Sequence, residues 1–223
     1  MMPKAVVLLS GGLDSAVTLA IAINEVEEIV AVSFRYGQKH TKELDSAEAV
    51  CKHYEIEHKI IDIDLSSFRS ALTHKNIKVP SDRKGKLDKQ IPSTYVPARN
   101  IIFLSIAAGV CESIGAEAIY IGANSIDYSG YPDCRREFFE AFRAMLEVGT
   151  KAGTEGKAPE IRTPILNLTK ADIVRKGKEL NTPLHLTWSC YEGGDKACGK
   201  CDSCRLRLKG FKEAGHTDEI NYR

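Results

Sequence analysis

With 223 residues, the chain is long enough for one α/β domain and a small appendage, and its 43% hydrophobic residues allow a sizeable core. A net charge of +1 excludes a protein whose whole surface binds nucleic acid, which needs an excess of Lys and Arg. The most apolar run, residues 101–111, is shorter than the ~20 residues that span a bilayer, and no export signal is recognisable. We therefore expect a cytoplasmic protein that binds no membrane and no nucleic acid directly.

Residues 4–9 form an apolar, β-branched run that predicts a buried strand, and residues 16–22 predict a helix. Between them stands Ser10-Gly11-Gly12-Leu13-Asp14-Ser15. The two glycines let the backbone turn tightly, so that Ser10, Ser15 and the free N–H groups at the helix start face one point. This arrangement predicts a site for an oxyanion such as a phosphate. The segment resembles the pyrophosphate-binding loop of the PP-loop ATP pyrophosphatases, which split ATP into AMP and pyrophosphate.

Strand and helix signals alternate through the first two-thirds of the chain. Further strands are predicted at residues 29–34, 59–63 and 118–122, and helices at 41–53, 98–113 and 135–148. Repeated units of this length predict an α/β fold with an open, mainly parallel, doubly wound sheet. The helix over 98–113 is apolar nearly all round, so we expect it to be buried.

Two polar segments interrupt this alternation. Residues 66–92 are mixed in charge and contain Pro and Gly, which predicts a solvated loop, with a lid over an active site as a second interpretation. Residues 149–159 are rich in Gly and Lys and predict another loop. A further helix opens near residue 168, where Thr169 as N-cap and Asp172 have the spacing of a capping box.

From residue 183 the chain is rich in Cys, Gly and Lys. We therefore divide it into an α/β nucleotide-binding domain, 1–182, and a small C-terminal region, 183–223, packed on it. Basic residues stand near the end of this region: Arg205, Arg207, Lys209 and Lys212. On a helix they mostly share one face, which we interpret as solvated, with nucleic-acid binding as the alternative.

Four cysteines lie close together in the C-terminal region: Cys190, Cys198, Cys201 and Cys204. Their close spacing, with glycines between them, predicts a tight knuckle that directs four sulfurs at one ion. Structural Zn²⁺ and an iron–sulfur cluster both take four thiolates, and the spacing leaves both open. Cys51 and Cys111 lie in apolar helix patterns and are expected to be small core residues.

Candidate ligand-binding residues follow the predicted strands, where open parallel sheets bind ligands. Tyr36 and Gln38 come after the second strand. Arg99 stands in the first turn of a predicted helix, where the helix dipole favours anions, and a bound phosphate would resolve that conflict. The segment 124–135, after the fourth strand, combines aromatic and polar groups that suit a flat heterocycle.

Together these segments resemble the 7-cyano-7-deazaguanine synthases, the preQ0 synthases of queuosine biosynthesis, over nearly the whole chain. The resemblance rests on the loop at 10–15, Tyr36-Gly37-Gln38, Val96-Pro97-Ala98-Arg99-Asn100, the segment 127–135 and the clustered cysteines. One departure is Ala98, where we expect Gly in the family.

The resemblance implies an ATP-dependent carbon–nitrogen ligase that converts 7-carboxy-7-deazaguanine and ammonia into 7-cyano-7-deazaguanine, releasing AMP and pyrophosphate. It also implies Mg²⁺ with ATP, one structural Zn²⁺ on the four cysteines, and a homodimer. The expected catalytic residues are Asp14, Arg99 and Lys170. The expected ATP-binding residues are Leu9, Ser10, Gly11, Gly12, Leu13, Asp14, Ser15, Ala16, Val17, Thr18 and Leu19. The expected deazapurine-binding residues are Tyr36, Gln38, Asp127, Tyr128, Tyr131 and Asp133.

Two other functions use parts of the same sequence. A tRNA-modifying thiolase or lysidine-type enzyme would use the same loop, but would need a broad basic surface that the net charge does not indicate. A zinc-ribbon protein that binds nucleic acid without catalysis would leave the loop at 10–15 without a purpose.

Overall fold

The computed structural model describes residues 4–74, 76–80, 91–126 and 131–223. Its centre is a five-stranded parallel sheet in the order β3-β2-β1-β4-β5. The strands are β1 (Lys4–Leu8), β2 (Glu28–Arg35), β3 (Glu57–Asp62), β4 (Ala118–Ile121) and β5 (Glu160–Arg162). In the central strand, Val6 pairs with Val30 of β2 and with Ile119 of β4. The predicted open parallel sheet is confirmed.

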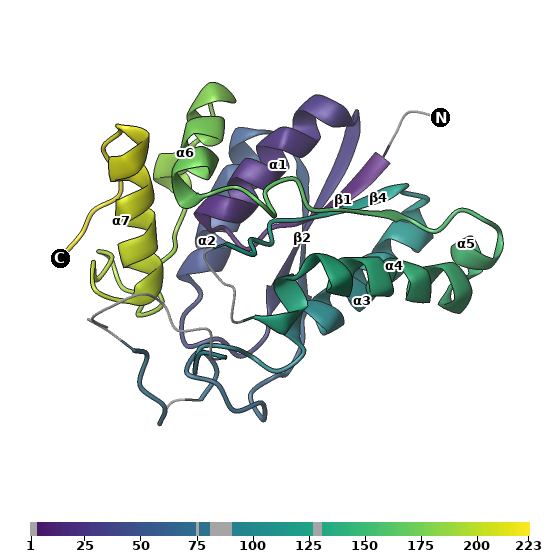
Figure 1. Ribbon diagram of the computed structural model, residues 1–223, viewed down its shortest axis with the longest axis horizontal. Helices are drawn as coiled ribbons and strands as arrows, with labels where there is room; N and C mark the ends of the chain where they lie inside the picture. The colour runs from purple at the N-terminus through teal and green to yellow at the C-terminus, as the bar shows by residue number, and fades with distance from the viewer. Residues whose placement is uncertain (1–3, 75, 81–90, 127–130) are drawn as a thin grey trace.

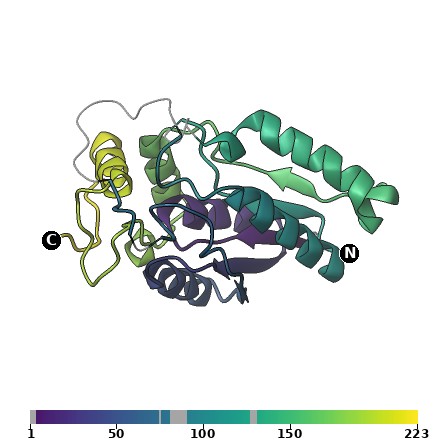
Figure 2. The same cartoon turned by 90° about the horizontal axis from the view of Figure 1, so that it is seen from below.

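Helices cover both faces of this sheet, with α1 and α2 on one face and α3 and α4 on the other (Figures 1 and 2). The helices are α1 (Leu13–Glu25), α2 (Lys42–His53), α3 (Arg99–Ile114), α4 (Arg136–Gly149), α5 (Lys151–Thr154), α6 (Lys170–Glu179) and α7 (Asp202–Ala214), with 3₁₀ turns at Pro132–Cys134 and Leu184–Leu186. Within the described residues, none of the helices combines the length and the apolar composition needed to cross a membrane.

The sequence of β1 explains why both faces are covered. Successive side chains of a strand point to opposite faces of a sheet. Val6 and Leu8 pack in the core beneath α3 and α4, whereas Val7 and Leu9 pack beneath α1 and α2. An apolar run without polar alternation therefore needs a layer of helices on each side.

The expectation that the helix over 98–113 is buried was wrong. Ile101 of α3 is 44% exposed. The buried residues of α3 are Leu104, Ala107, Ala108 and Cys111. The helix lies in the outer layer of the fold, so only one of its faces packs against the sheet. The opposite face is exposed, although it also carries apolar residues.

The expectation of a simple loop over 149–159 was also wrong in part. The short helix α5 forms there, and the Thr150 hydroxyl caps it by accepting a hydrogen bond from Gly153 N at 2.9 Å. The edge strand β5 follows and pairs with β4. With only three residues, β5 gives too short a pattern to be recognised from sequence.

The C-terminal region packs against the start of the chain. Phe211 of α7 shares a core with Leu13 and Val17 of α1. Trp188 N donates a hydrogen bond to the Gly11 carbonyl at 2.9 Å, so the last part of the chain supports the first loop. Figure 1 shows α7 and α6 side by side at one end of the molecule.

The interpretation of the basic residues of α7 as one solvated face was wrong for Arg207, which is 1% exposed. Its guanidinium makes a bidentate pair with Asp218, at 2.6 and 3.0 Å, and also donates to Thr187 Oγ1 and the Leu184 carbonyl. A buried arginine needs such complete pairing, and here the pairing ties α7 to the C-terminal segment.

Candidate nucleotide-binding cavity and cysteine cluster

The loop between β1 and α1 has a geometry that only glycine permits at one position. Gly11 has φ +84°, and a Cβ there would lie 2.0 Å from the Glu43 carbonyl oxygen of α2. The hydroxyls of Ser10 and Ser15 lie 3.0 Å apart, and Ser15 Oγ donates to the Gly12 carbonyl. No side chain caps α1, so its N-terminus offers N–H groups to an anion such as a phosphate.

Asp14 and Lys170, distant in the sequence, meet beside this loop. Lys170 Nζ lies 2.7 and 2.8 Å from the two carboxylate oxygens of Asp14. Lys170 is the first residue of α6, whose predicted capping box is present, with Thr169 Oγ1 accepting from Asp172 N at 3.2 Å. The cap fixes where α6 begins and thereby where the ammonium group of Lys170 lies.

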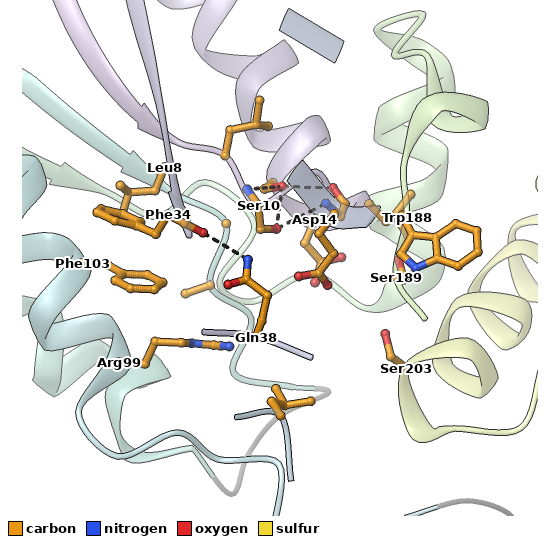
Figure 3. A pocket seen from close by; sticks show the side chains of 18 of the residues that line it. Leu8, Ser10, Asp14, Phe34, Gln38, Arg99, Phe103, Trp188, Ser189 and Ser203 are labelled. Atoms are coloured by element: carbon orange, nitrogen blue, oxygen red, sulfur yellow. Dashed lines mark hydrogen bonds between the residues drawn. The ribbon is translucent and has the colours of Figure 1, made fainter. Parts of the chain in front are cut away.

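A cavity of about 250 Å³ opens at the carboxyl ends of the strands. Figure 3 shows Phe34 and Phe103 on one side of Ser10 and Asp14. The two rings stack with centroids 4.0 Å apart, and Tyr36 meets Phe103 edge to face at 5.4 Å. These rings form an apolar wall that suits a flat heterocycle.

The opposite wall comes from the C-terminal region. Trp188, Ser189 and Ser203 lie there, across the cavity from Phe103 (Figure 3). Because Trp188 also holds the Gly11 carbonyl, this wall is fixed directly to the loop. Residues of the α/β domain, 1–182, and of the C-terminal region, 183–223, therefore both line the cavity.

Arg99 brings positive charge into the cavity from the start of α3. Burial alone would lower the pKa of Arg99, but the hydroxyls of Tyr36 and Tyr131 raise it above its usual value. Burial raises the pKa of Tyr36, although Arg99 opposes this effect. Burial also raises the pKa of Glu43 to about 7, again against the influence of Arg99.

Most of the expected ATP-loop and catalytic residues line the cavity. They are Leu9, Ser10, Gly12, Leu13, Asp14, Ser15, Arg99 and Lys170. Ala16, Val17 and Leu19 instead pack in the cores below α1 and do not line it. Thr18 is fully buried, and its hydroxyl donates to the Asp14 carbonyl. These four residues shape the helix behind the loop.

Two expected deazapurine-binding residues after β2, Tyr36 and Gln38, line the cavity. The Gln38 amide also holds the turn, because Oε1 accepts from Tyr36 N at 2.7 Å and Nε2 donates to the Phe34 carbonyl at 3.2 Å. Figure 3 shows this second bond.

The expected binding residues after β4 lie in different environments, and only some of them line the cavity. Tyr131 lines the cavity, and its hydroxyl lies 2.7 Å from Thr94 Oγ1. Asp133 is 4% exposed and does not line the cavity; its carboxylate accepts from Asn100 N at the start of α3. Asp127 and Tyr128 lie outside the described residues.

Glu43, Phe103 and Trp188 also line the cavity, although their sequence context did not predict it. An acidic residue in the first turn of a helix is common, so Glu43 carries no signal of its own. Phe103 was assigned to a buried helix, and Trp188 stands in an irregular segment. Only the tertiary fold brings them to the loop.

The four clustered cysteines converge. Their sulfur atoms lie within 4.8 Å of one another, all four residues are buried, and Cys198 Sγ is 3.9 Å from Cys204 Sγ. Backbone N–H groups point at the sulfurs, including Cys198 N to Cys190 Sγ at 3.3 Å and Cys201 N to Cys198 Sγ at 3.3 Å. Such bonds stabilise thiolate charge, so the cluster can hold a metal ion.

A family model described as "Queuosine biosynthesis protein QueC" matches residues 4–215. A 7-cyano-7-deazaguanine synthase of Thermoplasma volcanium is 56% identical over 220 residues, covering 98% of this chain and 90% of the relative. One of Acetivibrio thermocellus is 58% identical over 222 residues, covering 99% and 98%.

Solved structures show the same fold at much lower identity. A 4-thiouridine synthetase in complex with RNA and bound ATP has a TM-score of 0.51 and 20% identity, over 81% of this chain and 41% of that one. This likeness concerns the fold alone. The family match spans nearly the whole length, and the chain therefore belongs to the queuosine biosynthesis protein QueC family.

Proposed function

We propose that this protein is an ATP-dependent ligase that converts 7-carboxy-7-deazaguanine and ammonia into 7-cyano-7-deazaguanine. The single observation that carries the proposal is the Ser10–Ser15 loop, with the Asp14–Lys170 pair beside it, at one end of a cavity with an aromatic wall. The name of the close relatives supports the choice of product.

The chemistry follows from leaving groups. A carboxylate is a poor electrophile, so its oxygen first attacks the α-phosphorus of ATP and pyrophosphate leaves. Ammonia then displaces AMP from the acyl adenylate and forms the amide. The amide oxygen is activated by a second ATP in the same way, and loss of AMP gives the nitrile.

In this proposal the loop holds the pyrophosphate of ATP. The hydroxyls of Ser10 and Ser15 and the N-terminus of α1 face the phosphate oxygens. Lys170 and Arg99 neutralise the charge that develops as pyrophosphate leaves, and their fixed positions make this stabilisation effective. Asp14 orients Lys170, and Mg²⁺ bound with ATP would supply further neutralisation of the phosphates.

The deazapurine would lie against the aromatic wall. Phe34 and Phe103 offer a stacked, apolar surface to its ring, and Tyr36 and Tyr131 offer hydroxyls. We retain Gln38, Asp127, Tyr128 and Asp133 as proposed substrate-binding residues. The burial of Asp133 and its bond to Asn100 favour an indirect role for it, in which it positions the start of α3.

For the cysteine cluster we propose one structural Zn²⁺. A tetrahedral ion with Zn–S bonds of about 2.3 Å separates its sulfurs by about 3.8 Å, close to the 3.9 Å between Cys198 and Cys204. In a 4Fe–4S cluster each thiolate binds a different iron, and in a 2Fe–2S cluster the two pairs of thiolates bind different irons, so some of the sulfurs must lie farther apart than on one ion. The compact set of four sulfurs therefore favours a single ion over a cluster.

The decisive experiment incubates the protein with 7-carboxy-7-deazaguanine, ATP, Mg²⁺ and ammonium and follows products by mass spectrometry. We expect the amide and then the nitrile, with two AMP per nitrile. AMP formation with another acid, and no nitrile from 7-carboxy-7-deazaguanine, would contradict the proposal.

We also propose that the protein is a cytoplasmic homodimer and that it uses free ammonia. Light scattering in solution tests the dimer.

A further inference from the structure

The proposed reaction requires a proton acceptor, which the loop at residues 10–15 does not provide. The nitrogen enters as ammonia with three hydrogens and leaves as a nitrile with none. Three protons must therefore depart from one atom during a reaction cycle. Phosphate-binding groups such as Lys170 and Arg99 are cations and are poor proton acceptors at neutral pH. The cavity needs a base close to the reacting carbon.

Among the described residues that line the cavity, the candidate bases are two carboxylates and one imidazole: Asp14, Glu43 and His40. Asp14 is occupied, because both of its carboxylate oxygens lie within 2.8 Å of Lys170 Nζ. His40 Nδ1 is buried without a hydrogen-bond partner among the described residues, and burial lowers the pKa of the ring, so this imidazole is a weaker base than a solvated one.

Glu43 differs from both groups. Within the part of the chain that the structure describes, its carboxylate has no hydrogen bond or ion pair, although the side chain is half-buried and lines the cavity. Its backbone carbonyl packs against Gly11, so the residue is fixed beside the phosphate-binding loop. Arg99 and Tyr36 face it from the aromatic side of the cavity.

We propose that Glu43 is the general base that removes protons from the nitrogen during amide and nitrile formation. The inference rests on the proposed function, and it assigns the proton-transfer role to a residue outside the phosphate-binding loop. Its position next to the loop places a proton acceptor near the α-phosphorus, where the acyl carbon must lie when AMP leaves.

The protons balance in three steps. Ammonia attacks the acyl adenylate, the C–N bond forms, one proton passes to Glu43, and the C–O bond to AMP breaks. When the amide oxygen attacks the second ATP, the bond from the α-phosphorus to pyrophosphate breaks and a second N–H proton passes to Glu43. Finally the remaining N–H electron pair forms the third C–N bond while AMP leaves, and the third proton passes to Glu43. Between steps Glu43 returns each proton to water.

The surroundings of Glu43 suit repeated proton transfer. Burial raises its pKa to about 7; Arg99 opposes this shift, and Cys190 in the C-terminal region adds to it. A base with a pKa near the working pH both accepts and releases protons readily. As the pH falls through 7 the carboxylate becomes protonated, so amide and nitrile formation should slow on the acid side.

The test separates adenylation from proton transfer. Glu43→Gln keeps the shape of the side chain and removes the proton acceptor. We expect ATP–pyrophosphate exchange dependent on 7-carboxy-7-deazaguanine to stay within a few-fold of the unmodified protein. Amide and nitrile formation should fall by about 10²-fold or more, as is typical for loss of a general base. Glu48→Gln, on the exposed side of the same helix, is the matched control and should change neither.

Glu43→Ala supplies an independent readout. Added formate should restore part of its nitrile formation, and the acid-side fall in rate near pH 7 should be absent without formate. Equal loss of exchange and nitrile in Glu43→Gln, together with no rescue of Glu43→Ala, would overturn the inference, as would full nitrile formation by Glu43→Gln. Absence of exchange and of nitrile in the unmodified protein would instead overturn the proposed function.

Discussion

Gly210 of α7 lies directly against Lys170 of α6, so that a Cβ at residue 210 would stand 2.4 Å from Lys170 Cγ. The contact crosses from the C-terminal region to the residue that pairs with Asp14. The absence of a side chain at this one position lets two helices approach closely enough to hold the lysine stem in place. The position of Lys170, and with it the proposed phosphate-binding site, is therefore set partly by a glycine remote from the loop.

Gly210→Ala should displace the Lys170 side chain and lower kcat by about 10-fold or more, with a smaller change in KM for ATP. Gly109→Ala is the control, since Gly109 is also inside a helix and has nothing within 4 Å of its would-be Cβ. Replacing glycine by alanine inside a helix stabilises the folded protein by about 1 kcal/mol in both variants. The two variants therefore differ in the contact of residue 210 with Lys170. Steady-state AMP formation measures the effect; equal rates for both variants would show that the contact is not needed.

Lys170→Met should reduce substrate-dependent AMP formation by about 10²- to 10³-fold, because a fixed cation beside the leaving pyrophosphate is lost. Asp14→Ala should also lower the rate, since Lys170 loses the partner that orients it. Lys176→Met, on the same helix and paired with Glu179 at 38% side-chain exposure, is the matched control and should retain full activity. Full activity in Asp14→Ala would remove that residue from the site.

Ala98 carries backbone strain, because φ is +54° in the left-handed region immediately before α3. The expected family residue at this position is Gly, which adopts that conformation freely. Ala98→Gly should relieve about 1 kcal/mol of strain, offset in part by the greater entropy of glycine in the unfolded chain. We expect Tm to rise by about 1–2 °C. Ala49→Gly, inside α2, should lower it, and a fall for Ala98→Gly would contradict the assignment of strain.

Removal of the metal should expose thiols that are otherwise protected. Burial raises the pKa of Cys51, Cys111 and Cys134 to about 12, so these thiols are almost wholly protonated at pH 8 and react slowly. A chelator should therefore release one zinc per chain together with four rapidly reacting thiols, and lower Tm. Rapid reaction of four thiols before chelation would show that the cluster binds no metal.

Sequence reasoning predicted the parts of this protein that depend on local patterns. The loop at residues 10–15, the capping box at Thr169 and the cysteine knuckle each need only a few neighbouring residues. The apolar run of β1 was enough to predict a sheet covered on both faces. These predictions concern elements whose physical cause lies within one turn or one strand.

What escaped prediction depends on contacts between distant residues. Arg207 looks like a surface residue in sequence, and only the proximity of Asp218 explains its burial. Glu43 becomes a cavity residue because α2 packs against Gly11. Ile101 is apolar yet exposed, because only one face of α3 meets the sheet. For Arg207 and Glu43 the contacting residue lies outside the local sequence pattern. For Ile101 no other element of the described chain covers the outer face of the helix.

The bond from Trp188 N to the Gly11 carbonyl has a consequence for how the protein is made. Gly11 is synthesised long before Trp188, so the loop lacks this support until the later segment has been made. A nascent chain that has not yet reached Trp188 therefore lacks the hydrogen bond that holds the Gly11 carbonyl. If the loop holds the triphosphate, as proposed, a chain that stops short of Trp188 should bind ATP weakly.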